Sequence, residues 1–162
     1  MMFRKIFHSP IGTIDMQATN EGITLLGFVE NAEEVFDTSN SILEQACIQL
    51  TEYFNGQRIQ FEVPLAQSGT AFQKDIWQLL SQIPFGTTTS YHALAQTYGD
   101  VKAIRAIASA NGKNNIAILV PCHRVIGSNG ELTGFAWGLE RKRWLLEHEA
   151  RLSGKTLQAR MF

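Results

Sequence analysis

The sequence predicts an α+β protein in two parts: a small amino-terminal α/β domain with an antiparallel sheet over residues 1–68, and a mostly helical domain over residues 69–162. One observation is hydrophobic periodicity, because apolar residues alternate near the amino terminus and recur at helical spacing after residue 70. The other is charge: residues through Gly69 hold 3 Lys and Arg against 9 Asp and Glu, and the remainder holds 11 against 6. A basic second part suits an anionic partner such as a nucleic acid.

Three strands are expected near the amino terminus. Phe3–Phe7 has the composition of a strand, and Thr13–Thr19 alternates apolar with polar residues. A turn at Asn20-Glu21-Gly22 then leads into the apolar run Ile23–Val29. Strands on either side of a short Gly-containing turn predict a β-hairpin.

A helix is expected over Ser41–Asn55, with Gly56 as its stop. Cys47 lies beside its apolar stripe, so packing is the expected role of this thiol. The acidic stretch 33–39 before the helix is expected to be a connector, and residues 60–68 are expected to link the two parts. The apolar stripe consists of Ile42, Ala46, Leu50 and Phe54.

The second part is expected to open with a helix that begins at Thr70 and ends before Pro84. Thr70 and Gln73 have the spacing of a capping box, in which each side chain bonds the other residue's backbone N–H. Its apolar face is expected to contain Phe72, Ile76, Leu79, Leu80 and Ile83.

A helix-turn-helix pattern follows. Ser90 can cap a short helix over Tyr91–Thr97, and a second helix over Val101–Asn111 follows a tight Gly-containing turn. Many helical cores show the same pattern, so it predicts DNA binding only together with other features. The expected inner positions are Leu94, Ala95, Ile104 and Ile107.

The expected outer surface of the second helix is made of small residues. Only Lys102 and Arg105 carry charge there, whereas a helix that reads the major groove usually presents several long polar side chains to base edges. Such a helix would approach the DNA backbone or a shallow groove closely, with Arg105 as its one projecting side chain. The small residues are Ala103, Ala106, Ser109 and Ala110.

The run Ile118–Ile126 places a thiol, an imidazole and a guanidinium side by side among apolar residues. The apolar flanks predict a buried extended segment, and Pro121 predicts that the chain bends near Cys122. By itself the run leaves two readings open, because a buried Cys is as often an inert packing residue as a reactive one. If Cys122 and His123 act together, a turn or a bridging water has to join them.

The last expected helix covers Leu139–Leu152 and carries Glu149 near its end, and residues 153–162 show no clear pattern. Residues expected to face inward are Leu139, Leu145, Leu146, His148 and Leu152.

Composition argues against several classes of protein. No stretch approaches the roughly 18 apolar residues of a membrane span, and residues 1–14 lack a signal-peptide block, so a cytoplasmic protein without membrane contact is expected. Cys47 and Cys122 lie far apart without CxxC spacing, so we expect reduced thiols, no disulfide and no structural zinc.

Together these segments resemble the O6-alkylguanine-DNA alkyltransferase (methylated-DNA–protein-cysteine methyltransferase) family. The resemblance rests on Pro121-Cys122-His123-Arg124-Val125, on the preceding helix-turn-helix with Tyr91 and Arg105, and on the later run Trp144-Leu145-Leu146-Glu147-His148-Glu149. It spans Phe72 to Glu149, and residues 1–68 resemble the family's amino-terminal domain in length and element order only. It implies a ribonuclease-H-like domain followed by a winged-helix-like alkyltransferase domain.

The resemblance also implies a reaction, in which an alkyl group leaves O6 of a guanine in DNA, or possibly O4 of a thymine, and is attached irreversibly to Cys122. It implies that His123 is the base acting through a water, that Glu149 orients His123, and that Asn114 supports the active-site turn. The implied partner is double-stranded DNA that contains O6-alkylguanine. A monomer that uses no cofactor and no metal is expected.

Two further groups of residues follow from the resemblance. The implied DNA-binding residues are Tyr91, Arg105, Lys102, Ala106 and Arg124. The implied substrate-pocket residues are Tyr91, Val125, Phe135, Ala136 and Trp137.

The loop 133–137 departs from the family's pattern at two positions. Many members have Tyr where this chain has Phe135, so one hydroxyl is missing, while the backbone N–H of Ala136 can still reach the guanine oxygen. Many have Gly where this chain has Trp137. A bulky indole at the rim should narrow the pocket, so we expect methylguanine to be accepted much better than benzylguanine.

Three other functions account for part of the sequence. A lesion sensor of the same fold replaces the nucleophile, which the presence of Cys122 argues against. A Cys-His-Glu thiol hydrolase needs an oxyanion hole and leaves the helix-turn-helix with Arg105 unexplained. A plain winged-helix DNA-binding protein explains the basic second part but not the thiol.

Overall fold

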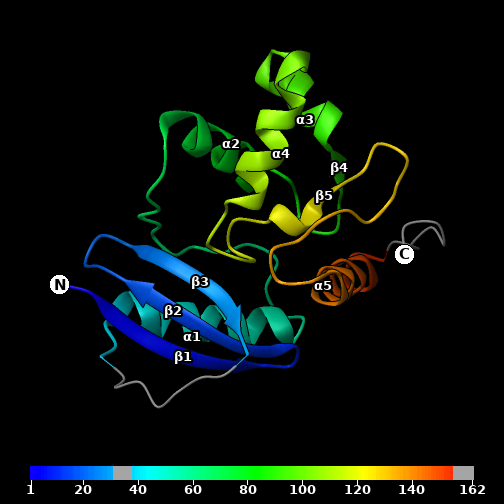
Figure 1. Ribbon diagram of the computed structural model, residues 1–162. Coiled ribbons are helices and arrows are strands. Elements are labelled where there is room, and N and C mark those ends of the chain that lie inside the picture. The colour runs from blue at the N-terminus through cyan, green and yellow to red at the C-terminus, as the bar shows by residue number, and fades with distance from the viewer. Residues whose placement is uncertain (31–37, 155–162) are drawn as a thin grey trace. The chain divides into compact units, whose positions relative to one another are not determined.

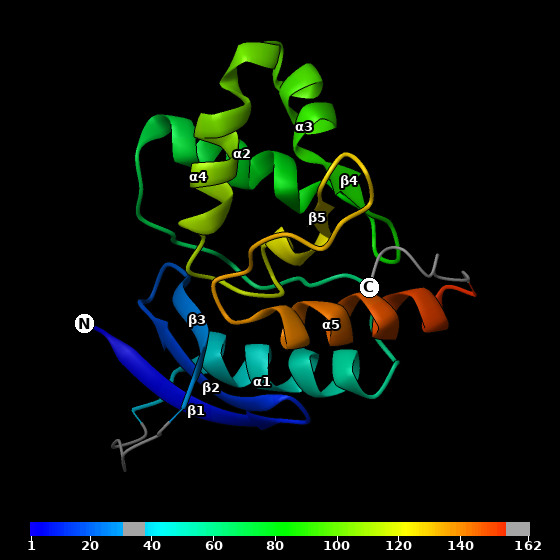
Figure 2. The same ribbon diagram turned by 45° about the vertical axis from the view of Figure 1, so that its right-hand side comes forward.

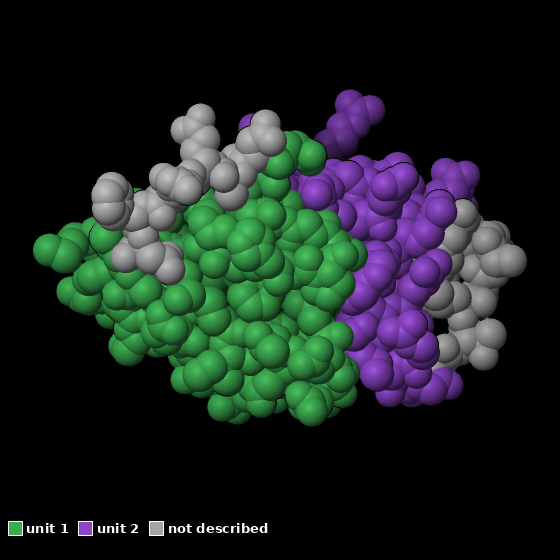
Figure 3. Space-filling model, turned by 90° about the horizontal axis from the view of Figure 1, so that it is seen from below, with its two compact units in different colours: residues 1–68, 115–117 green, residues 69–114, 118–162 purple. Residues whose placement is uncertain are grey.

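The computed structural model describes residues 1–30 and 38–154, shown as a ribbon in Figure 1. The chain forms two compact units, coloured separately in Figure 3. The first contains residues 1–68 and 115–117, and the second contains residues 69–114 and the chain from residue 118 onward. Most of the expected connector 33–39 and most of the patternless tail lie outside the described residues. None of the helices in the described chain has the length and apolar character needed to cross a bilayer.

The first unit holds a three-stranded antiparallel sheet in the order β1-β2-β3, which confirms the expected strands (Figure 1). The strands are β1 (Phe3–Ser9), β2 (Gly12–Ala18) and β3 (Ile23–Val29). In the register of β2 against β3, Ile14 pairs with Phe28 and Met16 with Leu26, and all four side chains are buried. Neighbouring strands are consecutive in the chain, as short hairpin connections require.

The helix α1 (Ser41–Phe54) packs on this sheet and confirms the expected helix. It is capped by Asn40, whose side chain accepts from the Leu43 N–H. The buried face of α1 differs slightly from the expected apolar stripe, because two residues of that stripe, Ile42 and Phe54, are only half-buried. Residues that share the buried face are Leu43, Ala46, Gln49, Leu50 and Tyr53.

Two distant segments cover the free edge of β3. Ile23 pairs in parallel with Leu65, and Leu26 pairs in parallel with Ile116. The Leu26 N–H donates to the carbonyl of Asn115 at 2.9 Å, and the Leu26 carbonyl accepts from Ala117 at 2.8 Å. An uncovered strand edge invites pairing with other chains, so these short segments protect the sheet. Nothing in the sequence indicated that residues 115–117 belong to the first unit.

The second unit begins with α2 (Ala71–Ser81), and both hydrogen bonds of the expected capping box between Thr70 and Gln73 are present. The helices of the helix-turn-helix are α3 (Tyr91–Tyr98), capped by Ser90, and α4 (Ile104–Gly112). Gly99 ends α3 with φ of 102°, a left-handed conformation that glycine adopts without strain.

The second helix of this pattern differs from expectation in three details. Its first turn, η1 (Val101–Ala103), is a 3₁₀ turn capped by Asp100. Ile104 is only half-buried. Ala110 is buried because its carbonyl accepts from the Trp77 indole N–H of α2 at 2.9 Å. The small outer surface therefore consists of Ala103, Ala106 and Ser109.

The remaining elements of the second unit are labelled in Figure 2 apart from the turn η2. They are β4 (Thr89–Ser90), the 3₁₀ turn η2 (Cys122–Arg124), β5 (Val125–Ile126), which pairs in parallel with β4, and α5 (Leu139–Leu152). The expectation that Leu139 and Leu152 face inward is wrong, since they are 46% and 42% exposed at the two ends of α5. The other expected inner residues of α5 are buried.

The run Ile118–Ile126 is buried as expected, but most of it is not extended. Only Val125 and Ile126 form a strand, and Ile118 has φ of 70°. Pro121 has φ of −81° and ψ of 61°, and the Cys122 N–H donates to the carbonyl of Val120 at 2.8 Å. These values define an inverse γ-turn, which is the expected bend before Cys122.

Candidate active site

Cys122 begins the 3₁₀ turn η2 and is 3% exposed. The buried amide of Asn114 supports the bend, because its Nδ2 donates to the Val120 carbonyl at 3.0 Å. A further side-chain hydrogen bond joins Asn114 to the Cys122 thiol. Asn114, two residues after the end of α4, is thus connected both to the backbone of the turn and to its sulfur.

The two residues that follow Cys122 in the chain belong to a buried charge network. The His123 Nε2 and the Glu149 Oε2 are 2.8 Å apart. Arg124 donates to the same carboxylate twice, from Nε to Oε1 at 2.8 Å and from Nη2 to Oε2 at 3.0 Å. The backbone N–H of Gly86 points at Oε1 at 3.4 Å. Glu149 therefore joins α5, the η2 turn and the loop after α2.

The expectation that Arg124 contacts DNA does not fit the structure. Its guanidinium is buried, with 6% of the residue exposed. Two of its nitrogens bind Glu149, and the third donates to the carbonyl of Ile83 at 2.7 Å. The guanidinium also lies 5.8 Å from the centre of the Phe85 ring. Arg124 is thus a buried counter-ion of Glu149.

The network keeps Glu149 ionised. Burial alone would raise the pKa of the carboxyl, but His123 and the hydrogen bonds and charge of Arg124 outweigh it and hold the pKa well below its usual range. Burial lowers the pKa of His123, so the imidazole is neutral at pH 7. An ionised carboxylate only accepts hydrogen bonds, so the single proton of the ring is on Nε2. The Nδ1 is buried and has no partner among the described residues, and it carries a free lone pair.

The thiol itself is protonated at rest. Burial raises the pKa of Cys122 to about 11, although Asn114 and Lys142 act in the opposite direction. A thiolate is the reactive form of cysteine, so any reaction at this sulfur requires a base that removes the proton. The unprotonated Nδ1 of the neighbouring His123 can serve as that base.

Lys142 is a buried residue of the site that the sequence analysis missed. It is fully buried on α5, and its Nζ donates to the carbonyls of Val125 and Thr133, each at 2.6 Å. It lies within the charged run 140–143, which is typical of a solvated helix surface. Helical spacing was the signal that could have identified it, because Lys142, Leu145 and Glu149 lie on one buried face.

The expected DNA-binding residues lie on the helix-turn-helix. Lys102, Arg105 and Ala106 are exposed on η1 and α4. Tyr91 is half-buried at the start of α3, and its hydroxyl accepts from the Asn111 Nδ2 at 3.4 Å. These residues therefore occupy the two helices that the pattern predicted.

Apart from Tyr91 on α3, the expected pocket residues lie on two segments. Val125 is fully buried directly after the η2 turn. Phe135 and Trp137 are half-buried, and their rings meet edge to face with centroids 5.2 Å apart. Ala136 is exposed between them. The two rings thus form a bulky apolar pair on this loop.

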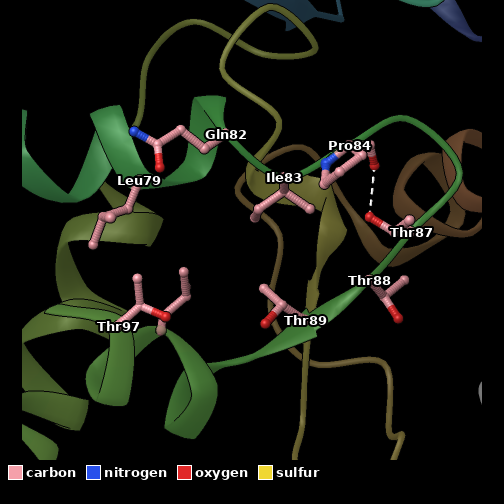
Figure 4. Close-up of a pocket in the computed structure, with 9 residues that line it drawn as sticks. Leu79, Gln82, Ile83, Pro84, Thr87, Thr88, Thr89 and Thr97 are labelled. Atoms are coloured by element: carbon pink, nitrogen blue, oxygen red, sulfur yellow. Dashed lines mark hydrogen bonds between the residues drawn. The ribbon is translucent and has the colours of Figure 1, made fainter.

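A cavity of about 270 Å³ lies elsewhere in the second unit (Figure 4). It carries no charged side chain and shares no residue with the expected substrate pocket. One of its hydroxyls, that of Thr87, donates to the Pro84 carbonyl at 2.7 Å. It is lined by Leu79, Gln82, Ile83, Pro84, Thr87, Thr88, Thr89, Leu94 and Thr97. Within residues 1–30 and 38–154, no three His, Cys, Asp or Glu side chains are grouped to hold a metal ion.

A buried thiol beside a neutral imidazole and an ionised carboxylate, on a unit with a helix-turn-helix, defines a class of thiol enzymes that handle DNA. Comparison with known proteins gives the family. The model of the 6-O-methylguanine DNA methyltransferase DNA binding domain matches residues 71–151, and that of the ribonuclease-like domain matches residues 2–67. The chain belongs to the 6-O-methylguanine DNA methyltransferase family, which confirms the resemblance.

Several relatives match along nearly their whole length. The methylated-DNA–protein-cysteine methyltransferase of Methanosarcina acetivorans is 44% identical, over 91% of this chain and 98% of the relative. A crystal structure of the Mycobacterium tuberculosis O6-methylguanine methyltransferase has a TM-score of 0.84 at 40% identity, over 93% of this chain and 94% of that chain. The structure of Mycobacterium tuberculosis OGT in complex with DNA has a TM-score of 0.82 at 41% identity, over 92% and 93%.

We expect the Glu149→Gln substitution to destabilise the protein and to weaken its sensitivity to acid. At pH 7 the loss should be about 3–5 kcal/mol, because Arg124 is left as a buried cation without a counter-ion. The folded-state pKa of Glu149 lies below its unfolded value, so its contribution is complete above about pH 4.3 and is lost as pH falls. The contribution of His123 to folding stability is also lost as pH falls, starting below about pH 6.5. This loss occurs both in the unmodified protein and in Glu149→Gln.

Urea unfolding at pH 7, 5, 4 and 3 measures both effects. Glu147→Gln is the matched control, since Glu147 is exposed on the same helix. It should lie within about 0.5 kcal/mol of the unmodified protein at every pH. An unchanged slope of stability against pH in Glu149→Gln would show that the carboxylate is not the ionised centre of the network.

Proposed function

We propose that this protein repairs DNA by moving the methyl group of an O6-methylguanine onto the sulfur of Cys122, once per protein molecule. The observation that carries the proposal is the buried Cys122 beside His123 and Glu149, on the unit that matches the family's DNA-binding domain. The Sγ–carbon bond forms as the carbon–O6 bond breaks, and the bonding electrons remain on the guanine, which takes up a proton. The product is a thioether that no group in the site can cleave, so the protein is consumed.

The network supplies the missing thiolate. Glu149 holds the imidazole proton on Nε2, so the Nδ1 lone pair is free to take the thiol proton through a bridging water. Asn114 holds the turn and the sulfur in place. Because Cys122 has a pKa of about 11, the resting thiol is protected from unrelated electrophiles.

The target base has to leave the helix to reach the sulfur. Extrusion costs a few kcal/mol, and less for a poorly paired base such as an alkylated guanine. Arg105, exposed on α4, would fill the gap in the stack, and Tyr91 would donate to the extruded base. Lys102 and Ala106, exposed on η1 and α4, would lie on the surface that meets the DNA. The small outer surface of α4 suits the minor groove, where sequence readout is degenerate and a repair protein needs none.

The substrate specificity rests on the loop that carries Phe135, Ala136 and Trp137. The backbone N–H of Ala136 would donate to O6 of the guanine, and Val125 would line the pocket. The edge-to-face pair of Phe135 and Trp137 supports a narrow rim. Preference for methyl over benzyl groups remains a prediction, as do activity on O4-alkylthymine and function as a cytoplasmic monomer. The reaction as written requires no cofactor.

The lesion sensor and the thiol hydrolase lead to different products. A sensor would bind alkylated DNA and leave Cys122 unmodified. A hydrolase would release its product and regenerate the thiol. The alkyltransferase ends with one methyl group on Cys122 and no further turnover.

We expect incubation with duplex DNA that carries a single O6-methylguanine to add 14 Da, one methylene equivalent, to the Cys122 peptide, with a stoichiometry near one. Peptide mapping by mass spectrometry measures this. Cys122→Ser should bind the same DNA and transfer nothing, and the Cys47 peptide serves as an internal control. Repeated turnover, or a methyl group on Cys47 alone, would contradict the proposal.

We expect Arg105→Ala to slow repair of duplex DNA by about 10-fold or more, while the reaction with free O6-methylguanine base changes less than about 2-fold. The reason is that Arg105 would act on extrusion, and a free base needs none. Single-turnover rates on both substrates measure the effect. Lys113→Ala, which removes an exposed cation just after α4, is the control. Equal slowing on both substrates would place Arg105 in the pocket instead.

A further inference from the structure

Lys142 is a buried cation without a carboxylate partner in the described chain. Its side chain is fully buried, and both hydrogen bonds of Nζ go to neutral carbonyl oxygens. The nearby Glu149 is already taken by His123 and Arg124. Burial of an uncompensated ammonium costs several kcal/mol, and a methionine would fill a similar volume without that cost. Because stability alone does not explain this buried charge, we expect a role in function.

The two carbonyls place this ammonium between the segment that follows Cys122 and the loop 133–137. Val125 directly follows the η2 turn that begins with Cys122, and Thr133 begins the loop that carries Phe135 and Trp137. Burial lowers the pKa of Lys142 to about 8, whereas the negative charge that Cys122 carries when ionised has the opposite effect on this pKa. The charge of Lys142 in turn lowers the pKa of the Cys122 thiol, which burial raises. Thiol and ammonium therefore influence each other inside a poorly solvated site.

The other groups around the sulfur leave this charge uncompensated. Asn114 is neutral, and His123 is neutral because burial lowers its pKa. The negative charge of Glu149 is balanced by Arg124. With Cys122 as a neutral thiol, the cluster carries one net positive charge, that of Lys142. If Cys122 ionises, the positive charge of Lys142 is available to stabilise its thiolate, because none of the other groups named here balances that charge.

We propose that Lys142 is a positioning residue of the alkyl transfer, whose ammonium is fixed by the carbonyls of Val125 and Thr133 so that it stabilises the thiolate of Cys122. The part played in repair rests on the proposed function, but the effect on the thiol does not. The competing role is a purely structural clamp between the turn and the loop. A clamp needs only hydrogen-bond donors, whereas stabilisation of a thiolate needs the charge.

Two substitutions separate these roles. Lys142→Gln retains N–H donors for the carbonyls and loses the charge, and Lys142→Met loses both. Lys74→Gln is the matched control, because Lys74 is exposed on α2. The probe is iodoacetamide, a small neutral electrophile that needs no DNA, and alkylation is followed at the Cys122 peptide by mass spectrometry. Thermal unfolding verifies that each variant is folded.

For Lys142→Gln we expect alkylation of Cys122 about tenfold slower than in the unmodified protein at pH 7, which corresponds to one pKa unit. The difference should shrink above about pH 8, where Lys142 itself loses its proton. Lys142→Met should be slowed at least as much, and Lys74→Gln should match the unmodified protein. A normal rate in Lys142→Gln with a slow rate in Lys142→Met would overturn the proposal and leave the clamp.

The unmodified protein gives a second test if the variants do not fold. Its logarithmic alkylation rate should rise with pH at a slope below one around pH 8, because loss of the Lys142 proton makes ionisation of Cys122 less favourable. A constant slope of one through this range would contradict the proposal. Methyl transfer from DNA is measured in parallel. If that reaction is absent in the unmodified protein, the proposed function fails, while the iodoacetamide result still decides the role of Lys142.

Discussion

The site depends on the burial of one ionised carboxylate. Glu149 is 1% exposed, and a charge at that depth is tolerable only because Arg124 binds it with two hydrogen bonds and His123 with a third. The same contacts join α5 to the turn that carries Cys122 and, through the Ile83 carbonyl, to the end of α2. One ion pair thus fixes the architecture of the second unit and also the proton on His123. Stability and reactivity are coupled at this residue.

Around that centre, the thiol is kept neutral until it is needed. Burial raises its pKa, while Asn114 and Lys142 favour ionisation to a smaller extent. A protein used only once gains from this balance, because a permanently ionised Cys122 would react with any small electrophile. Under the proposals above, the base at Nδ1 of His123 and the ammonium of Lys142 would both favour the thiolate of Cys122. The exposed residues of α3 and α4 would then select duplex DNA by shape.

Local signals in the sequence predicted much of this structure. The Thr70 capping box and the bend at Pro121 are determined by a few neighbouring residues, so they could be foreseen. Arg124 could not be placed, because its surroundings depend on a carboxylate 25 positions later that packing brings to 2.8 Å. Lys142 was missed because its charge suggested solvent exposure, whereas two carbonyls from distant segments make its burial possible. The pairing of residues 115–117 with β3 likewise has no local signal.

Glu149 holds neutral His123 with its proton on Nε2, so that Nδ1 is free to accept the thiol proton. Long-range ¹H–¹⁵N correlation spectra of ¹⁵N-histidine-labelled protein at pH 7 report the protonation of both ring nitrogens directly. His123→Gln identifies the signals of His123 among the four histidines of the chain. The account predicts a protonated Nε2 and an unprotonated Nδ1. A proton on Nδ1, alone or together with Nε2, would contradict it.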